Sequence, residues 1–170
     1  MEEIENVKKK NYFKEFLPYI LIILFVIFIK TYVMSPIRVN GVSMNPTLDD
    51  EDIMLLDEVS YRFSDIHRFD IVVVRMNDEY LIKRVIGLPG EKVQYINGEL
   101  YIDGEYVKED FKHKKTSDFS ATVGKGQYFV MGDNRTNSTD SRVFGAVQRE
   151  NIIGKTSLTI FPISRFGSKN

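Results

Sequence analysis

The sequence predicts a mainly β protein, in which an antiparallel sheet domain follows one N-terminal transmembrane helix. Two observations support this fold class. An apolar run near the N-terminus has the length of a membrane span. After it, the chain changes to short runs rich in Val, Ile and Tyr that are separated by Gly, Asn and Asp. We therefore expect a cytoplasmic segment at residues 1–16, the membrane anchor at 17–34 and an extracytoplasmic β-rich domain at 35–170.

The predicted anchor is apolar apart from Lys30 and a few tolerated polar residues. As a helix it would be about 27 Å long, close to the roughly 30 Å of a hydrocarbon core. Pro18 falls in the first turn, where it breaks no backbone hydrogen bond, and Lys30 can extend its ammonium to the interface. A cleaved signal peptide would have a shorter apolar core, and Pro36 directly follows the best cleavage site. A retained anchor is favoured, with a buried core helix as the alternative.

The charges that flank the apolar run predict its orientation. Several lysines precede it, whereas only two basic residues lie near its far end: Lys8, Lys9, Lys10 and Lys14, against Lys30 and Arg38. Cytoplasmic flanks carry the excess of basic residues, so we expect a single-pass protein of the cell membrane with its N-terminus in the cytoplasm. The lysines could instead form a solvated charge run that the nearby glutamates balance.

Composition excludes several kinds of chemistry. The chain has 23 basic and 24 acidic residues, a balance that lacks the basic footprint of a nucleic-acid-binding protein, so we expect no nucleic-acid partner. It has no cysteine, which removes disulfides, thiolate metal sites and thiol nucleophiles. The acidic run at 49–52 lacks the alternating ligands and the glycine of a calcium loop and is expected to be a solvent-facing turn. We expect neither a metal nor a cofactor.

Turn dipeptides divide the domain into strands. Residues 71–75 and 80–86 flank Asn77 and Asp78 and predict an antiparallel pair. Asn-Gly and Asp-Gly, which suit tight hairpins, predict a meander over 92–107. Further strands are expected at 53–56, 127–131 and 155–161. Residues 108–125 read as a polar excursion, whose basic cluster at 112–115 either touches anionic lipid or, more commonly, is solvated surface.

The sequence offers no recognisable site with histidine as the base. His67 and His113 both lie beside basic residues, and the Gly-x-Ser-x-Gly and His-Glu-x-x-His motifs are absent. A hydrolytic site would then need a different base. Lysine can serve when burial lowers its pKa.

A lysine interrupts the apolar strand at 80–86. Strand alternation places Lys83 on the same face as Leu81 and Val85, with Arg84 on the opposite face. Adjacent charges cannot both face solvent in a sheet with one buried side, so one of them is buried or partnered, and its apolar neighbours favour Lys83. The alternative is that Lys83 is an edge charge that discourages aggregation.

Two polar segments complete the pattern. Ser43 lies in a stretch that must turn, between Gly41 and Pro46, although most serines in turns simply bond the backbone. Residues 131–142 are too polar for a core and too rich in hydrogen-bonding groups for a plain linker. Read alone, they are an Asx-rich turn held together by its charges.

Together these segments resemble the type I signal peptidases. The Ser-Met-x-Pro-Thr-Leu box is at 43–48, Lys-Arg-Val-Ile-Gly-Leu-Pro-Gly at 83–90 and Gly-Asp-Asn-Arg-x-x-Ser-x-Asp-Ser-Arg at 132–142. Residues 69–73 match an intervening strand, with Phe69 where glycine is more usual. Three boxes of this length, in this order, are far more specific than a single motif. The resemblance runs from the anchor to about Pro162.

The resemblance implies a serine endopeptidase with a signal-peptidase-type β fold. Ser43 would attack the scissile carbonyl, and Lys83 would remove its proton. Ser138 would hydrogen-bond to the lysine amine and orient it, and Asp140 and Arg142 would form an ion pair that shapes the site.

The resemblance also implies an oxyanion site and a class of substrate. The oxyanion would be held by the backbone N–H of Ser43 and by a neighbouring donor, although some relatives place a helpful serine where this chain has Gly41. Substrates would be secretory precursors with Ala-x-Ala-like signal peptides, beside membrane lipid. Shallow apolar pockets for their small side chains would come from the strands around Ile82 and the Ser43 turn.

Two alternative functions share part of this pattern. A non-catalytic, membrane-anchored interaction member of the same family would be expected to lose Ser43 or Lys83, and both residues are present. A self-cleaving repressor could share a Ser-Lys dyad. It should also carry a DNA-binding segment and a cleavage loop, and neither is visible in the sequence.

Overall fold

The structure is a computed structural model that describes residues 12–32 and 34–169. The chain divides into two compact units, residues 1–33 and 34–170. In the first unit, helix α1 (Tyr12–Tyr32) covers most of the predicted anchor. The helix begins before the apolar run, so Pro18 lies in its interior, and the prediction that Pro18 falls in the first turn is wrong. The side chains of residues 16–26 are all exposed. Within the described residues, no helix combines the length and the apolar character that crossing a membrane requires.

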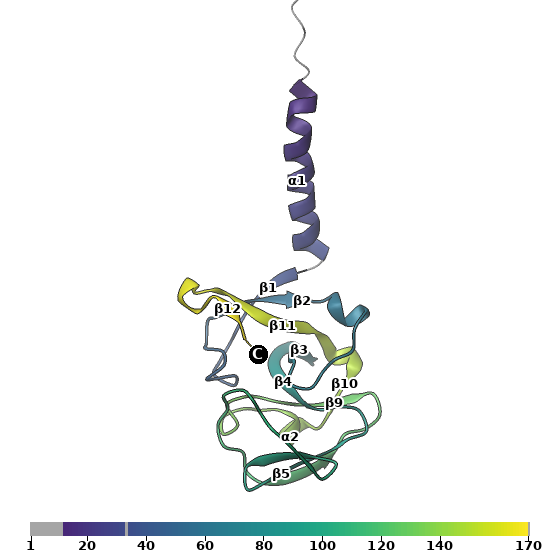
Figure 1. Cartoon of the computed structure of the whole chain (residues 1–170), viewed down its shortest axis with the longest axis vertical. Coiled ribbons are helices and arrows are strands. Elements are labelled where there is room, and N and C mark those ends of the chain that lie inside the picture. The colour runs from purple at the N-terminus through teal and green to yellow at the C-terminus, as the bar shows by residue number, and fades with distance from the viewer. Residues whose placement is uncertain (1–11, 33, 170) are drawn as a thin grey trace, which may run out of the picture. The chain divides into compact units, whose positions relative to one another are not determined.

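The second unit is built on a large antiparallel sheet of eight strands. Their order is β1-β2-β11-β3-β4-β9-β10, and β12 pairs with β11 (Figure 1). The strands are β1 (Met34–Arg38), β2 (Ile53–Asp57), β3 (Ile71–Met76), β4 (Glu79–Gly87), β9 (Gln127–Met131), β10 (Val147–Gln148), β11 (Ile152–Phe161) and β12 (Gly167–Ser168).

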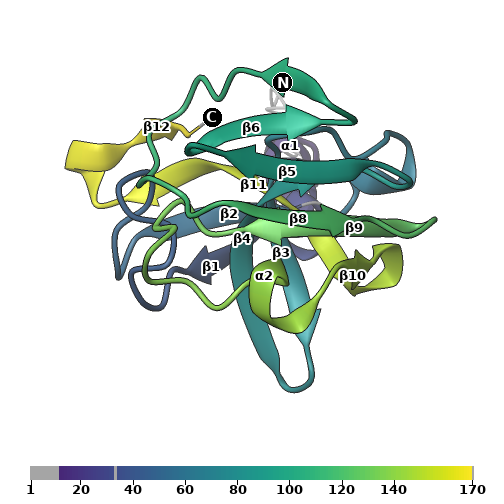
Figure 2. The ribbon, with the colours of Figure 1, turned by 90° about the horizontal axis from the view of Figure 1, so that it is seen from below.

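A smaller antiparallel sheet has the order β7-β6-β5-β8, and its strands β6, β5 and β8 lie side by side in Figure 2. Its strands are β5 (Lys92–Ile96), β6 (Glu99–Ile102), β7 (Glu105–Val107) and β8 (Phe119–Thr122). Asn97-Gly98 and Asp103-Gly104 form the two tight turns between them, and all four residues have positive φ, as turns of type I′ require. Both predicted hairpins are thus confirmed.

Short helices connect the strands. They are α2 (Ser141–Phe144) and the single 3₁₀ turns η1 (Ser60–Arg62), η2 (Arg149–Asn151) and η3 (Ile163–Arg165). The prediction of a mainly β, antiparallel fold is therefore confirmed for the second unit.

The sequence patterns missed four strands, β1, β8, β10 and β12, each for an identifiable reason. Strand β1 contains Pro36, which argues against a central strand, and it lies at an edge of the described sheet, where a missing N–H is tolerated. Strand β8 lies inside the predicted polar excursion at 108–125, so that prediction was partly wrong. It pairs with β5 over four residues, too few for a clear alternation. Strands β10 and β12 have two residues each.

The second half of strand β4, residues 83–87, is buried on both faces, and this position determines where the core lies. Val85 packs in one apolar cluster with residues of β3 and β9, while Ile86 packs in another with residues of the smaller sheet. A third cluster lies under the turn that carries Ser43, and it includes Met44 and Leu48. The larger sheet is thus packed against both the smaller sheet and the Ser43 turn.

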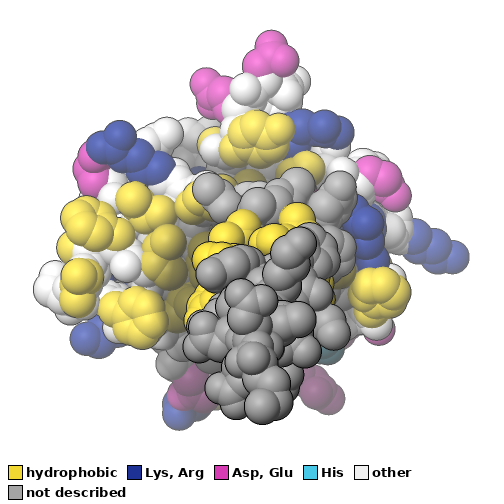
Figure 3. Space-filling view, turned by 90° about the horizontal axis from the view of Figure 1, so that it is seen from above, with side chains coloured by type: hydrophobic (Ala, Val, Ile, Leu, Met, Phe, Trp, Pro, Cys, Tyr) yellow, Lys and Arg dark blue, Asp and Glu magenta, His cyan; other side chains and the backbone are white. Residues whose placement is uncertain are grey.

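Apolar side chains also gather on the surface around the turn between β11 and β12. Phe161, Ile163 and Phe166 are all exposed there, and Ile163 keeps 83% of its surface. In Figure 3 a group of apolar side chains is visible on the side of the molecule where Figure 1 places this turn. An exposed apolar group of this kind is typical of a surface that meets a partner or a membrane.

Phe69 has a left-handed backbone, with φ of +73°. Its N–H donates to the carbonyl of Val85, and its own carbonyl accepts from Arg84 Nη1 at 2.9 Å, so the chain enters β3 in a fixed direction. Its ring lies 5.2 Å from that of Phe111. The resemblance places glycine here, and the backbone gives the reason, because glycine adopts this conformation without a Cβ clash.

This conformation predicts an unusual order of stability for two variants. Phe69→Gly and Phe69→Ala both lose the ring, but only alanine keeps the clash, so the glycine variant should be more stable by about 1 kcal/mol. At the ordinary, exposed strand position Arg75, glycine should instead be less stable than alanine by roughly 0.5–1 kcal/mol. Urea unfolding of the four variants in one detergent measures both differences. The same order at both positions would contradict the strain at Phe69.

Candidate active site

Ser43 lies on a series of turns that buried side chains and backbone hydrogen bonds hold in place. Met44 and Leu48 are buried in the third apolar cluster, and backbone hydrogen bonds from Thr47 and Leu48 to the carbonyl of Met44 close the turn. Gly41 enters it with φ of +89°, and its N–H donates to Asp50 Oδ1 at 2.7 Å. Ser43 itself is half-buried and lines a cleft.

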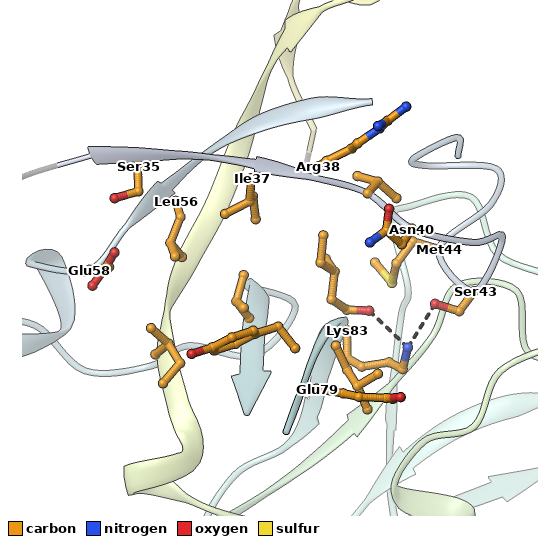
Figure 4. Close-up of a pocket in the computed structure, with 16 residues that line it drawn as sticks. Ser35, Ile37, Arg38, Asn40, Ser43, Met44, Leu56, Glu58, Glu79 and Lys83 are labelled. Carbon is orange, nitrogen blue, oxygen red and sulfur yellow. Dashed lines mark hydrogen bonds between the residues drawn. The ribbon is translucent and has the colours of Figure 1, made fainter. Parts of the chain in front are cut away.

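Lys83 reaches Ser43 from the centre of the larger sheet. Its Nζ donates to Ser43 Oγ at 2.8 Å and to the carbonyl of Ile82 at 3.1 Å (Figure 4). Lys83 is 3% exposed, and the neighbouring Arg84 is fully buried. Strand β4 pairs with β3 on one side and β9 on the other, so the alternative of an edge charge is wrong. Both cations are buried, so the expectation that one of them is buried or partnered is confirmed.

Burial lowers the pKa of Lys83 from 10.5 to about 8, and the negative charge of Asp140 opposes this change. No carboxylate of the described residues forms an ion pair with Lys83. A difference of this size corresponds to about 3 kcal/mol between the charged and neutral forms. Desolvation thus makes the neutral amine, which can accept a proton, accessible near neutral pH.

A cleft of about 770 Å³ extends from the Ser43–Lys83 contact. In Figure 4, Ser43 and Lys83 lie at one end of it, and Ser35 and Glu58 at the other. One wall comes from β1 and the Ser43 turn, and the other comes largely from β4. Its apolar lining includes Ile37, Val39, Met44, Leu56, Val73, Leu81, Ile82 and Ile153.

The polar segment after β9 packs directly against the Ser43 turn. Asp133 forms a buried, bidentate ion pair with Arg84, at 2.9 and 2.7 Å. It also accepts a hydrogen bond from Thr47 Oγ1 at 2.5 Å. The next residue, Asn134, donates to the carbonyls of Val42 and Ser43. The sequence indicated that this segment is held together by its charges, but the roles of Asp133 and Asn134 had not been predicted.

Asp140 and Arg142 form an ion pair within this segment, at 2.7 Å between Asp140 Oδ2 and Arg142 Nη2. Asp140 also accepts the backbone N–H groups of Gly132 and Arg142. Burial acts to raise the pKa of Asp140, but the hydrogen bonds from Arg142 and Gly132 outweigh it and hold that pKa below its ordinary value. Asp140 is therefore a fixed negative charge that ties the two ends of the segment together.

Ser138 was predicted to hydrogen-bond to the Lys83 amine, and the structure does not show this bond. Its Oγ is buried and lies beside the Asp140 carboxylate, whose pKa it helps to lower, whereas Lys83 Nζ bonds to Ser43 and Ile82 instead. Its role in orienting the lysine stays a prediction.

The remaining polar residues singled out from the sequence lie outside the cleft lining. His67 is exposed, and His113 Nε2 lies 3.3 Å from Glu109 Oε2. In the described part of the chain, no three acidic or histidine side chains are placed to hold a metal ion.

The acidic run at 49–52 was predicted to face solvent throughout, which is wrong for Asp52. Asp52 is buried, accepts the N–H of Asp49 and pairs with Arg165 at 3.1 Å. Its carboxylate therefore closes the end of the Ser43 turn.

Comparisons with known proteins identify the family to which this fold and site belong. The family model described as "Signal peptidase, peptidase S26" matches residues 10–161. The chain is 44% identical to Signal peptidase I V of Bacillus subtilis (strain 168), over 84% of this chain and 95% of that one. It is 35% identical to Signal peptidase IB of Staphylococcus aureus (strain COL), over 85% and 86% respectively.

A solved structure agrees with these sequence relatives. The crystal structure of a signal peptidase I from Enterococcus faecalis V583 matches with a TM-score of 0.50 and 38% identity, and it covers 54% of this chain and 97% of that one. The chain therefore belongs to the type I signal peptidases of peptidase family S26.

Gly132 lies where the polar segment and the Ser43 turn approach most closely. A Cβ atom at this position would collide with the carbonyl oxygen of Ser43 and with the Ser138 side chain. The backbone of the turn cannot move aside without displacing Ser43, whereas the end of a flexible side chain could.

Gly132→Ala should therefore destabilise the protein by about 1–3 kcal/mol, the usual cost of overpacking. Gly124→Ala is the matched control, because the atoms that a Cβ would meet there belong to the flexible end of Gln127, and we expect a loss below about 1 kcal/mol. Urea unfolding compares the two variants. Equal stabilities would contradict the close backbone approach at Gly132.

Proposed function

We propose that the chain is a membrane-bound serine endopeptidase that removes N-terminal signal peptides from secreted precursor proteins, with Ser43 as nucleophile and Lys83 as general base. The observation that carries the proposal is the 2.8 Å contact between Ser43 Oγ and Lys83 Nζ. The lysine in this contact is buried and has a lowered pKa. An activated serine needs a base within hydrogen-bond reach, and this contact supplies it.

The acylation step uses both residues. The neutral amine of Lys83 takes the proton of Ser43 Oγ as that oxygen bonds to the scissile carbonyl carbon, and the carbonyl π electrons move onto its oxygen. When the tetrahedral intermediate collapses, the C–N bond breaks and Lys83 donates its proton to the leaving amine. The products of this half-reaction are the ester of Ser43 and a free N-terminus.

Deacylation repeats the same proton transfers with water. Lys83 takes a proton from the attacking water and later returns it to Ser43 Oγ as the ester C–O bond breaks. The ion pair of Asp140 and Arg142 would hold the polar segment that packs against the Ser43 turn, and Ser138 is the proposed hydroxyl for orienting the amine. The backbone N–H of Ser43 is the proposed oxyanion donor, and it has no acceptor among the described residues.

The cleft supports binding of an extended peptide with small side chains. Within the described sheet, β1 pairs only with β2, so its other edge is available for backbone hydrogen bonds to a peptide strand. Ile37, Met44 and Ile82 line the cleft near the serine and leave apolar space there. Signal peptides of the Ala-x-Ala type have the small residues that such space would accept.

Attachment at the membrane, with the N-terminus in the cytoplasm, is part of the proposal. It rests on the apolar run at 17–34 with its preceding lysines, and on the exposed apolar side chains along residues 16–26 of α1. The exposed group of Phe161, Ile163 and Phe166 in the second unit is a further surface that lipid could cover. A protease held at the membrane would meet its substrates in a thin layer, at high effective concentration.

Ser43→Ala and Lys83→Met test the proposed chemistry. We expect both variants, as purified full-length protein in detergent, to lose cleavage of a precursor with an Ala-x-Ala signal peptide. Methionine keeps a stem of similar length but offers no base. Lys112→Met, at an exposed lysine outside the cleft, is the matched control and should cleave like the wild type. Normal cleavage by folded Ser43→Ala would refute the proposal and leave a non-catalytic role as the better account.

The lowered pKa of Lys83 predicts the pH dependence of the activity. Only the neutral amine is active, so kcat/KM for a short signal-peptide substrate should be low in acid and rise with pH through about 8. Below this value the rate should change about tenfold per pH unit. Circular dichroism at each pH checks that the protein stays folded. A rising limb centred near 10.5 would mean that Lys83 is not desolvated in the free enzyme.

A further inference from the structure

Asn134 makes contacts that the proposed chemistry does not use. It is 3% exposed and lies on the polar segment between the two buried ion-pairing residues Asp133 and Arg135. Its backbone N–H donates to the carbonyl of Ser43 at 3.0 Å, and its side-chain Nδ2 donates to the carbonyl of Val42 at 3.0 Å. A single buried residue thus binds the peptide groups on both sides of Ser43.

The hydrogen bond to Val42 has a geometric consequence. The peptide bond between Val42 and Ser43 is trans and planar, so its C=O and N–H point in opposite directions. When Asn134 Nδ2 holds the Val42 carbonyl, the direction of the Ser43 N–H is fixed as well. This N–H is the donor proposed for the oxyanion, and preorganised donors make the largest contribution at such sites.

The hydrogen bond from Asn134 to Val42 also affects the strength of the Ser43 N–H as a donor and the direction of the Ser43 side chain. A hydrogen bond to a peptide carbonyl polarises that peptide group and strengthens its N–H as a donor. Because both peptide groups beside Ser43 are held, its backbone dihedral angles are held too, and so is the direction in which Oγ leaves the chain towards Lys83.

The side chain of Asn134 is itself fixed in the orientation that this contact needs. Its Oδ1 accepts a hydrogen bond from Thr136 Oγ1 at 3.3 Å, which leaves Nδ2 for the Val42 carbonyl. The residue is also supported by its neighbour Asp133, which binds Arg84, next to Lys83 in β4, and Thr47, on the Ser43 turn. The Asn134 amide binds the turn that carries the proposed nucleophile, and its neighbour Asp133 binds the strand that carries the proposed base.

We propose that Asn134 is a positioning residue for the oxyanion donor and the nucleophile, acting through the carbonyl of Val42. This inference rests on the proposed function of Ser43. It predicts that loss of the side-chain amide weakens stabilisation of the transition state, while ground-state binding and the proton affinity of Lys83 stay the same.

Asn134→Ala and Asn134→Ser test this prediction, because neither side chain can reach the Val42 carbonyl while both keep the backbone contact to Ser43. We expect kcat to fall about 10- to 100-fold, less than the loss of a whole oxyanion donor. KM should stay within about threefold, and the rising pH limb should stay at its wild-type position. Asn137→Ala, at an exposed asparagine of the same segment, is the matched control and should behave like the wild type.

Two inhibitors separate positioning from a structural role. A peptide aldehyde ending in Ala-x-Ala adds Ser43 Oγ to its carbonyl carbon and forms an oxyanion, whereas the matching peptide alcohol binds without one. In Asn134→Ala the aldehyde should bind more weakly by about the same factor as kcat falls, and the affinity of the alcohol should not change. A merely structural role would weaken both inhibitors together or shift the pH limb.

Unchanged kcat and aldehyde affinity in either folded variant would overturn the inference, as would equal weakening of both inhibitors. The serine variant provides the measurement if the alanine variant does not fold. Inactive Ser43→Ala combined with fully active Asn134→Ala would remove this inference alone. Active Ser43→Ala would remove the proposed function on which it rests.

Discussion

Strand β4 contains two consecutive buried cations, Lys83 and Arg84. The site depends on the difference between their partners. Arg84 is fully compensated by a bidentate ion pair with Asp133, by the carbonyl of Phe69 and by the ring of Phe111, whose centroid lies 3.9 Å from its guanidinium carbon. Among the described residues, Lys83 has only a hydroxyl and a carbonyl as partners. A buried cation without an anion favours its neutral form, whereas one with a paired carboxylate stays charged. The same strand thus carries one cation that stays charged and supports the structure, and a second whose charge can change and which is the proposed base.

The polar segment after β9 connects this strand to the rest of the second unit. Asp133 binds β4, and Asn134 binds the Ser43 turn. Arg135 donates to Tyr95 Oη in the smaller sheet and to Glu109 Oε1 just after β7, at 2.6 Å each. These contacts come from three consecutive residues that are all buried. Buried, satisfied polar networks of this kind define one arrangement of their surroundings. The geometry at Ser43 therefore depends on both sheets, including the one that contributes nothing to the cleft lining.

Much of this arrangement could be predicted from the sequence, and the limits have physical causes. Period-2 alternation and the Asn-Gly and Asp-Gly turns predicted the longer strands and both hairpins, because these signals are local. Alternation also indicated a buried cation at 83–84, although it could not tell that β4 is covered on both faces, since that depends on strands distant in sequence. The contacts of Asn134 with Val42 and of Arg135 with Glu109 join segments far apart in the chain, and no local pattern encodes them. Whether a short segment such as β8 forms a strand depends on pairing with a neighbouring strand, here β5, more than on its own residues.

The hydrogen bond between Lys83 and Ser43 has a direction that depends on protonation. With the ammonium present, Nζ donates to Oγ, and the serine proton points elsewhere. When the lysine loses its proton, the lone pair of the amine can accept, and the hydroxyl turns to donate. With a pKa of about 8, roughly one molecule in ten carries the neutral amine at pH 7. At neutral pH the Ser43 hydroxyl therefore mostly faces a donor, and in the proposed mechanism each cycle would start from the minority of molecules in which this single hydrogen bond has reversed.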